Sequence, residues 1–102
     1  MSDERVKFET IINLGMGHIK RFYGDKISDI RLEEIHSPSD ETAGRWYVTI
    51  GFLYPDRKPD PGKNALRALM IARGEEPMER LYKRLIFDQY GEFLEMENRL
   101  VP

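Results

Sequence analysis

The stretch Arg45–Tyr54 reads RWYVTIGFLY, and its apolar residues alternate with a period of two. This alternation predicts a single β-strand. One face of the strand carries the large apolar residues Trp46, Val48, Ile50, Phe52 and Tyr54. The other face carries the mixed set Tyr47, Thr49, Gly51 and Leu53. We therefore predict that the first face packs in the core and that the second stays open to water or to a partner.

The size and composition of the chain are those of one small globular domain. It has 102 residues, of which 40% are hydrophobic and 33% charged, and its formal net charge is -2. A chain of this length buries one core between a sheet and a covering helix, so we predict a single domain over residues 1–102. The charge balance indicates no class of partner. The absence of cysteine excludes disulfides and thiolate chemistry and fits a reducing compartment.

The start of the sequence and the length of its apolar runs indicate where in the cell the protein is located. Residues 1–7 are charged from the third onward and contain no apolar run of signal-peptide length, and no stretch of the sequence is long enough to span a bilayer. We therefore expect a cytoplasmic protein that is not embedded in a membrane.

Apolar residues show the spacing of a helix near the start of the chain, well before the strand over residues 45–54, which we call the tryptophan strand. Apolar residues recur every three or four positions between residues 3 and 23, which predicts a helix capped by Ser2 or Asp3 and ended by Gly24. Gly15 and Gly17 each weaken such a helix by roughly 1 kcal/mol relative to alanine. We interpret them as a place where the helix backbone approaches the sheet.

Two predicted strands form a hairpin in the first half of the chain. Residues 26–36 predict a strand in which Ile35 is out of phase, as a bulge or a strand end would produce. The polar residues 37–44 predict a surface loop, and the tryptophan strand follows it. That strand stops at Tyr54-Pro55, because proline lacks the amide that the ladder needs.

The connection that follows and the last third of the chain complete the fold prediction. Within residues 55–77, the segment 64–73 predicts a short helix. Residues 78–87 fit either a strand, followed by a glycine-containing turn and a strand over 93–97, or a helix within a helical hairpin over 64–90. We favour the strands. The fold class is then α+β: an N-terminal helix packed on a four-stranded antiparallel sheet, in the order αββ(α)ββ.

Charge is unevenly distributed in this second half. Residues 56–84 contain eight basic and five acidic side chains, whereas residues 85–102 contain one basic and four acidic side chains. We interpret this as charge pairing between neighbouring strands on a solvated face. The alternative is a nucleic-acid-binding surface on the basic segment 57–84, although such proteins usually have a basic excess overall.

Short motifs in the second half resemble those of a known group of proteins. The residues that carry the resemblance are Trp46-x-Val48-Thr49-x-Gly51-Phe52, Arg80-x-Tyr82-Lys83, Asp88-x-x-Gly91-Glu92 and Met96-x-x-Arg99. They resemble a group of small uncharacterised bacterial proteins and are more distantly similar to PepSY-like domains. The resemblance implies an αββ(α)ββ domain used for interaction or inhibition, with no catalytic residue to carry over.

Candidate catalytic and metal-binding residues are few. A metal site needs three or four converging ligands, but the chain has only His18 and His36 and no cysteine. No serine lies at a strand-to-helix elbow, and the Glu33-Glu34 pair needs a pocket that raises one pKa before it can act as an acid. We therefore predict no enzyme, no metal and no cofactor. A small ligand-binding protein or enzyme with a pocket at either histidine is kept as an alternative.

The remaining candidate is a surface for a partner. If the helix covers the tryptophan face, Tyr47, Thr49 and Leu53 lie on the open face, where Tyr82 and Arg84 of the third strand stand beside them. Tyrosine and arginine are enriched in binding hot spots. We predict a non-enzymatic module that binds an unknown protein partner there, an immunity or inhibitor protein being one form of it. A tyrosine pair that only stabilises the sheet, and a homodimer of stacked open faces, are alternatives.

Overall fold

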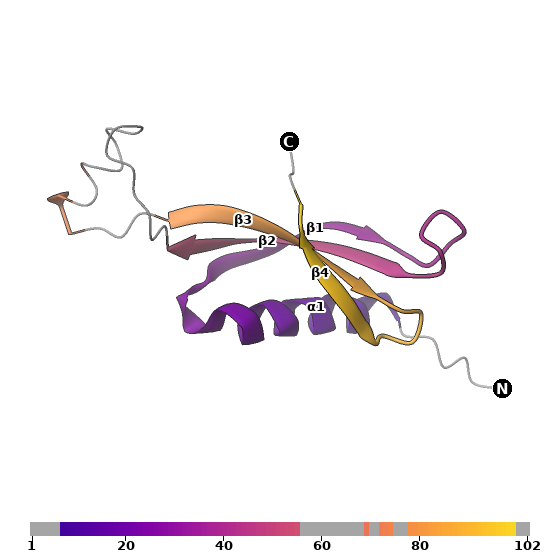
Figure 1. Ribbon diagram of the computed structural model, residues 1–102. Helices are drawn as coiled ribbons and strands as arrows, with labels where there is room; N and C mark the ends of the chain where they lie inside the picture. Colours follow the sequence, from indigo (N-terminus) through magenta and orange to yellow (C-terminus); the bar gives the residue numbers. More distant parts are fainter. Residues whose placement is uncertain (1–6, 56–68, 70–71, 75–77, 100–102) are drawn as a thin grey trace.

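The computed structural model describes residues 7–55, 69, 72–74 and 78–99, which form one helix on one sheet (Figure 1). Helix α1 (Phe8–Tyr23) leads through a 3-10 turn η1 (Gly24–Lys26) into the sheet. Its four strands are β1 (Ser28–His36), β2 (Trp46–Pro55), β3 (Met78–Phe87) and β4 (Phe93–Asn98). They lie in the order β1-β2-β3-β4, and every neighbouring pair is antiparallel. The predicted α+β fold is confirmed.

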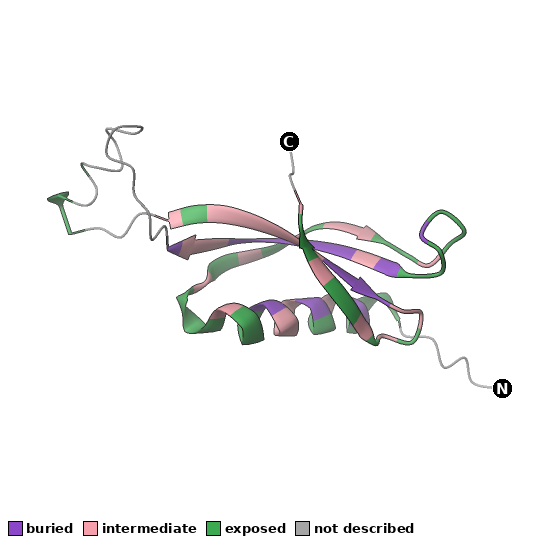
Figure 2. Cartoon of the chain, in the orientation of Figure 1, coloured by how far each residue is buried: buried purple, intermediate pink, exposed green. Residues whose placement is uncertain are grey.

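The core lies between α1 and the middle of the sheet. Strand β2 supplies Val48, Ile50 and Phe52, which are fully buried, and the helix supplies Ile11 and Ile19. Purple segments on the facing sides of α1 and β2 show this layer in Figure 2. The alternation in β2 therefore has the predicted cause, since its large apolar face meets the helix.

Helix α1 differs from the prediction at its start and in its buried stripe. It begins at Phe8, with Ile11 N donating to Lys7 O, and no side chain caps it. The predicted caps Ser2 and Asp3 lie outside the described residues. Its end is as predicted, because the N–H of Gly24 bonds to Lys20 O.

The stripe that α1 buries is narrower than the full set of its apolar residues. It consists of Ile11, Gly15 and Ile19, while Phe8 and Phe22 are about half exposed. A Cβ on Gly15 would lie 3.0 Å from Ile50 Cδ1, whereas one on Gly17 would meet nothing within 4 Å. The predicted close approach to the sheet is therefore confirmed at Gly15 and wrong at Gly17.

Strand β1 carries the irregularity that the phase of Ile35 predicted. Its register with β2 shifts between Leu32 and Glu34, and a second shift lies between Ser28 and Arg31. The bulge returns Ile35 to the helix side, where it packs against the core with Leu32. The strand starts at Ser28 rather than at residue 26, because the chain first makes the turn η1.

The second half of the chain forms the favoured pair of strands. Residues 78–87 pair with β2 without a register shift, and Gly91 N bonds to Asp88 O in the turn before β4. The alternative helical hairpin over 64–90 is therefore wrong, because residues 78–87 form a strand that pairs with β2 along its whole length. The predicted helix over 64–73 lies mostly outside the described residues, although Arg73 N bonds to Leu69 O as in a helical turn.

Candidate partner-binding face

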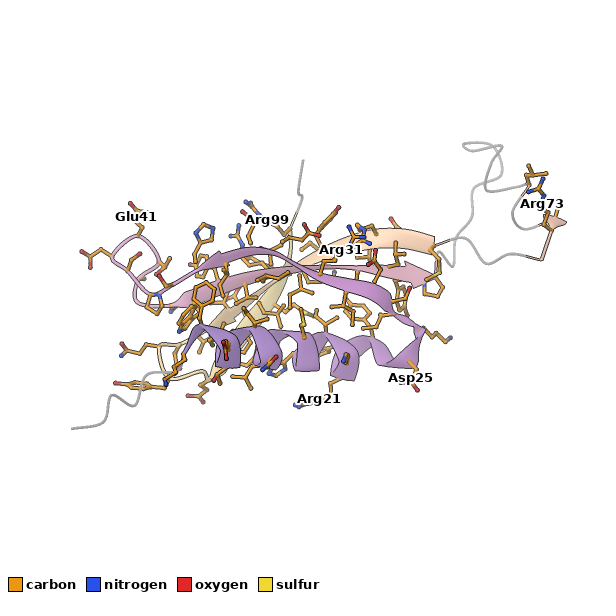
Figure 3. The ribbon with its side chains drawn as sticks, turned by 180° about the vertical axis from the view of Figure 1, so that it is seen from behind. Arg21, Asp25, Arg31, Glu41, Arg73 and Arg99 are labelled. Atoms are coloured by element: carbon orange, nitrogen blue, oxygen red, sulfur yellow. The ribbon has the colours of Figure 1, made fainter. Side chains whose placement is uncertain are left out.

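The sheet face that α1 does not cover is the candidate site, and we call it the open face. The registers place on it residues that include Arg31, Glu34, His36, Tyr47, Thr49, Gly51, Leu53, Arg80, Tyr82, Arg84, Ile86, Glu95 and Glu97. Figure 3 shows Arg31 and Arg99 projecting from this side of the sheet, whereas Arg21 and Asp25 lie on the helix side. All five residues predicted to bind a partner belong to the open face.

A polar row crosses the middle of the open face from edge to edge. Glu34 of β1 is opposite Thr49 of β2, Thr49 is opposite Arg84 of β3, and Arg84 is opposite Glu97 of β4. The Thr49 side chain hydrogen-bonds to the Glu34 carboxylate. Since Thr49 is only 1% exposed, it supports its neighbours and offers almost no surface to a partner.

Arg84 is the cation of this row, and two neighbouring side chains hold it in place. Its Nη1 donates to Glu97 Oε1 at 3.2 Å, and its guanidinium carbon lies 5.4 Å from the centre of the Tyr47 ring. The Arg84 side chain is 19% exposed, and its Nε has no hydrogen-bond partner among the described residues. The cation–π contact and the ion pair together fix the position of the guanidinium. The Arg84–Glu97 pair also confirms the predicted charge pairing between these strands.

Tyr82 and Leu53 lie on the open face beyond the polar row, toward the end of β2 and the start of β3. The Tyr82 ring covers Gly51 of β2, because a Cβ at that glycine would meet Tyr82 Cε1 at 3.0 Å. Leu53 is half-buried opposite Arg80. The alternative of a cross-strand tyrosine pair is wrong, since Tyr47 is opposite Ile86 and Tyr82 is opposite Gly51.

A second set of ion pairs surrounds these residues, and sequence reasoning missed it. Arg99 Nε donates to Glu34 Oε1 at 3.0 Å, and its Nη2 approaches Glu34 Oε2 at 3.5 Å. Asp29 binds both Arg31, at 2.9 Å, and Arg80. Charge alternation within the strands hinted at such pairs, but only the register and the β1 bulge decide which partners meet.

These contacts set the protonation of the open-face carboxyls. The hydrogen bond from Arg99 is the main cause that lowers the pKa of Glu34, and it raises the pKa of Arg99 in turn. The hydrogen bond from Arg31 is the main cause that lowers the pKa of Asp29. A lowered pKa is the opposite of what a general acid at neutral pH needs. The carboxyls of this face that have shifted pKa values are therefore ion-pair partners.

The two histidines do not converge. His36 lies on the open face, with its Nε2 3.9 Å from Glu34 Oε2. His18 lies on α1 with its ring stacked on Phe93 at 4.5 Å between centroids. It lines a hollow of about 260 Å³ together with Arg21, Phe22 and Phe93. Burial lowers the pKa of His18, and Arg21 adds to the effect. No group of three metal-ligating side chains occurs within the described ranges.

Comparisons with known proteins provide no family for this chain. No protein-family model matches it, and neither the curated proteins nor the solved structures contain a match. No helix in the described part of the chain is long and apolar enough to cross a membrane.

Proposed function

We propose that this protein is a non-enzymatic interaction module that binds a protein partner through its open face, in the manner of an immunity or inhibitor protein. The observation that carries the proposal is the arrangement around Arg84. Its guanidinium is held against Tyr47 and Glu97 at the centre of a face that α1 leaves uncovered. An arginine and an aromatic ring that are already ordered lose little side-chain entropy on binding.

The composition of the face suits recognition of a protein. Tyr47, Tyr82 and Leu53 are half-buried, so each still presents apolar area beside fixed charges. Interfaces of this kind combine aromatic and arginine anchors with a polar surround. The charged groups are paired with one another, which favours a partner with matching polar groups rather than a strongly charged polymer.

The nucleic-acid alternative receives less support from the same contacts. Most of its basic segment, residues 57–84, lies outside the described residues. In the described part, Arg80 bonds to Asp29 and Arg84 bonds to Glu97. Phosphate binding requires cations whose charge is free to displace counterions, so neutralised arginines are poor candidates.

Site-specific photo-crosslinking tests the proposal. A photoreactive phenylalanine analogue replaces Leu53 or Tyr82 on the open face, and in the matched controls it replaces Asn13 or Lys20 on the exposed side of α1. After irradiation in the cells that produce the protein, we expect the two open-face positions to crosslink to the same protein, and the helix positions not to crosslink to it.

Two results contradict the proposal. Crosslinking of the same protein from Asn13 or Lys20 with equal yield would place the contact on the helix. A crosslink from Leu53 or Tyr82 to a second copy of this chain would support the homodimer alternative instead. Each probe variant is first checked for an unchanged thermal midpoint. A missing crosslink then shows that the probe position does not contact the partner, and not that the variant is unfolded.

A further inference from the structure

Three aromatic rings wall the hollow between α1 and the start of β4. The rings of His18 and Phe93 are stacked with their centroids 4.5 Å apart, and the centroid of Phe22 lies 6.4 Å from each of them. Phe22 is 58% exposed, so its ring is accessible from solution. The hollow measures about 260 Å³, slightly less than the roughly 300–1,000 Å³ typical of pockets for drug-sized molecules. Its size therefore suits a ligand of one or two rings.

Arg21 gives the hollow its charge. Its side chain lines the space next to the three rings. The ion pairs of the described residues all lie on the open face, so no carboxylate among those residues neutralises Arg21. Burial and Arg21 lower the pKa of His18, and no described carboxylate opposes them. At pH 7 His18 is therefore neutral, and Arg21 is the cation that a ligand in the hollow meets.

The hollow is separate from the open face. Figure 3 shows Arg21 on the helix side of the sheet, and Arg31 and Arg99 on the other side. All four side chains that line the hollow are among the described residues. Three of them belong to the last two turns of α1, and the fourth is the first residue of β4. A ligand in the hollow would therefore leave the open face free.

The small extent of the hollow argues against a protein as its occupant. Stable protein interfaces bury about 800 Å² on each partner and involve about 20–30 residues a side, whereas four side chains line this hollow. A small molecule with an aromatic ring suits it better, because paired aromatic rings attract each other beyond the gain from burial of apolar area. The guanidinium of Arg21 favours a planar carboxylate, which it can bind with two parallel hydrogen bonds.

We propose that the hollow between α1 and β4 binds a small aromatic carboxylate, whose ring packs on the three aromatic side chains and whose carboxylate meets Arg21. The ring supplies most of the contact area, because three of the four lining side chains are aromatic. The carboxylate supplies selectivity of modest size, since Arg21 is exposed and an exposed ion pair is weak. Affinity for a one-ring ligand is therefore in the millimolar range.

Phenylacetate is the probe, and two molecules of matched shape are its controls. Phenylacetamide keeps the ring and removes the charge, whereas cyclohexylacetate keeps the charge and removes the aromatic ring. In an NMR titration of the isotope-labelled protein, phenylacetate should shift the signals of residues 18–22 and 93. We expect its dissociation constant to be about two- to fivefold lower than that of phenylacetamide, and about two- to tenfold lower than that of cyclohexylacetate.

Two pairs of variants connect the binding to the hollow. Arg21→Gln should weaken the binding of phenylacetate about two- to fivefold and leave that of phenylacetamide unchanged. Lys20→Gln removes the same charge from the neighbouring exposed position and should leave both unchanged. Phe22→Ala should abolish binding at millimolar concentration, whereas Phe8→Ala, at a half-exposed aromatic position at the start of α1, should preserve it.

His18 provides a readout that a change in folding would not produce. Because a nearby carboxylate favours the imidazolium form, saturating phenylacetate should raise the pKa of His18, and phenylacetamide should not. Arg21 is the charged side chain that acts on His18 from α1, while β3 and β4 pack against it through Phe87 and Phe93.

Several results would overturn the proposal. They are the absence of shift changes with phenylacetate, equal binding of phenylacetamide or cyclohexylacetate, and unchanged binding by Phe22→Ala. Shift changes at residues 18–22 that depend on protein concentration without any ligand would instead place a second copy of this chain in the hollow. None of these results affects the open-face proposal, because the crosslinking probes at Leu53 and Tyr82 report the other side of the sheet.

Discussion

Arg99, the residue after β4, donates from Nε to Glu34 Oε1 at 3.0 Å, although 65 positions separate the two residues. The bond joins the C-terminal end of the described chain to the first strand across the open face. The same Arg99 donates its backbone N–H to Tyr82 O. This single residue therefore extends the sheet by one bond and anchors a carboxylate beside Thr49.

The Arg99–Glu34 pair predicts a pH dependence of stability. The pKa of Glu34 lies below its ordinary value of 4.5 in the folded protein. Its contribution is then fully present above pH 4.5 and is lost as the pH falls through the lower folded value. Glu34→Gln should reduce the free energy of unfolding at pH 7 by about 1 kcal/mol or less, the range of exposed pairs, and should flatten the decline below pH 4.5.

Urea denaturation between pH 3 and pH 7 measures this effect. Glu41→Gln is the matched control, since Glu41 is an exposed carboxylate on the loop before β2 that pairs with no described residue. An acid-induced decline of the same steepness in wild type and Glu34→Gln would show that the pair does not contribute.

The contrast between Gly15 and Gly17 supplies a second prediction. Alanine at either position gains up to about 1 kcal/mol of helix propensity. At Gly17 the new methyl group meets no atom within 4 Å, so Gly17→Ala should stabilise the protein by about 0.5–1 kcal/mol. At Gly15 it meets Ile50 Cδ1 at 3.0 Å and Val48 Cγ1 at 3.4 Å in the filled core.

Overpacking therefore offsets the gain at Gly15. Inserted methyl groups in a packed core cost typically about 1–3 kcal/mol, so we expect Gly15→Ala to be less stable than wild type. Urea denaturation of both variants measures the difference. A stabilisation of equal size at the two positions would mean that α1 moves away from β2 without cost.

The sequence predicts the strands but not the ion pairs of the open face, and the reason is physical. The alternation from Trp46 to Tyr54 and the phase of Ile35 are local patterns, and burial enforces both. Arg99 and Glu34 carry no such pattern, because their meeting depends on three strand registers and on the β1 bulge. Thr49 was expected to face a partner, but it is only 1% exposed between Glu34 and Arg84 on the neighbouring strands.

The loop before β2 provides a third prediction. Ala43 has a left-handed φ of 55°, and Gly44 follows with a φ of 74°. A residue with a Cβ is strained by roughly 1 kcal/mol in this region, whereas glycine is not. Ala43→Gly should therefore leave stability nearly unchanged or raise it slightly, since relief of strain opposes the added freedom of the unfolded chain.

The opposite substitution, Gly44→Ala at the neighbouring position, is the comparison for Ala43→Gly. Gly44→Ala should destabilise the protein by about 1 kcal/mol, because no atom crowds the site and only the backbone conformation is unfavourable. Thermal unfolding of both variants distinguishes the effects. A Gly44→Ala variant as stable as wild type would mean that the loop readily adopts another conformation.

The last prediction concerns Arg84, whose removal should affect stability as well as binding. Because its side chain is 19% exposed and its guanidinium lies over Tyr47, Arg84→Ala should lower the free energy of unfolding by about 1–2 kcal/mol through lost packing. Arg84→Lys keeps the charge but not the planar contact, so it should lose less. Arg45→Ala, at an exposed site beside β2, should change stability by less than about 0.5 kcal/mol.

A double-mutant cycle separates the two contacts of Arg84. Glu97 is 43% exposed, so its coupling to Arg84 should be below about 1 kcal/mol and should decrease with salt. The coupling of Arg84 to Tyr47, measured with Tyr47→Leu, should be about 0.5–1 kcal/mol and change little with salt, because the ring and the guanidinium exclude water from their contact. Equal salt dependence of both couplings would mean that charge pairing alone holds Arg84 in place.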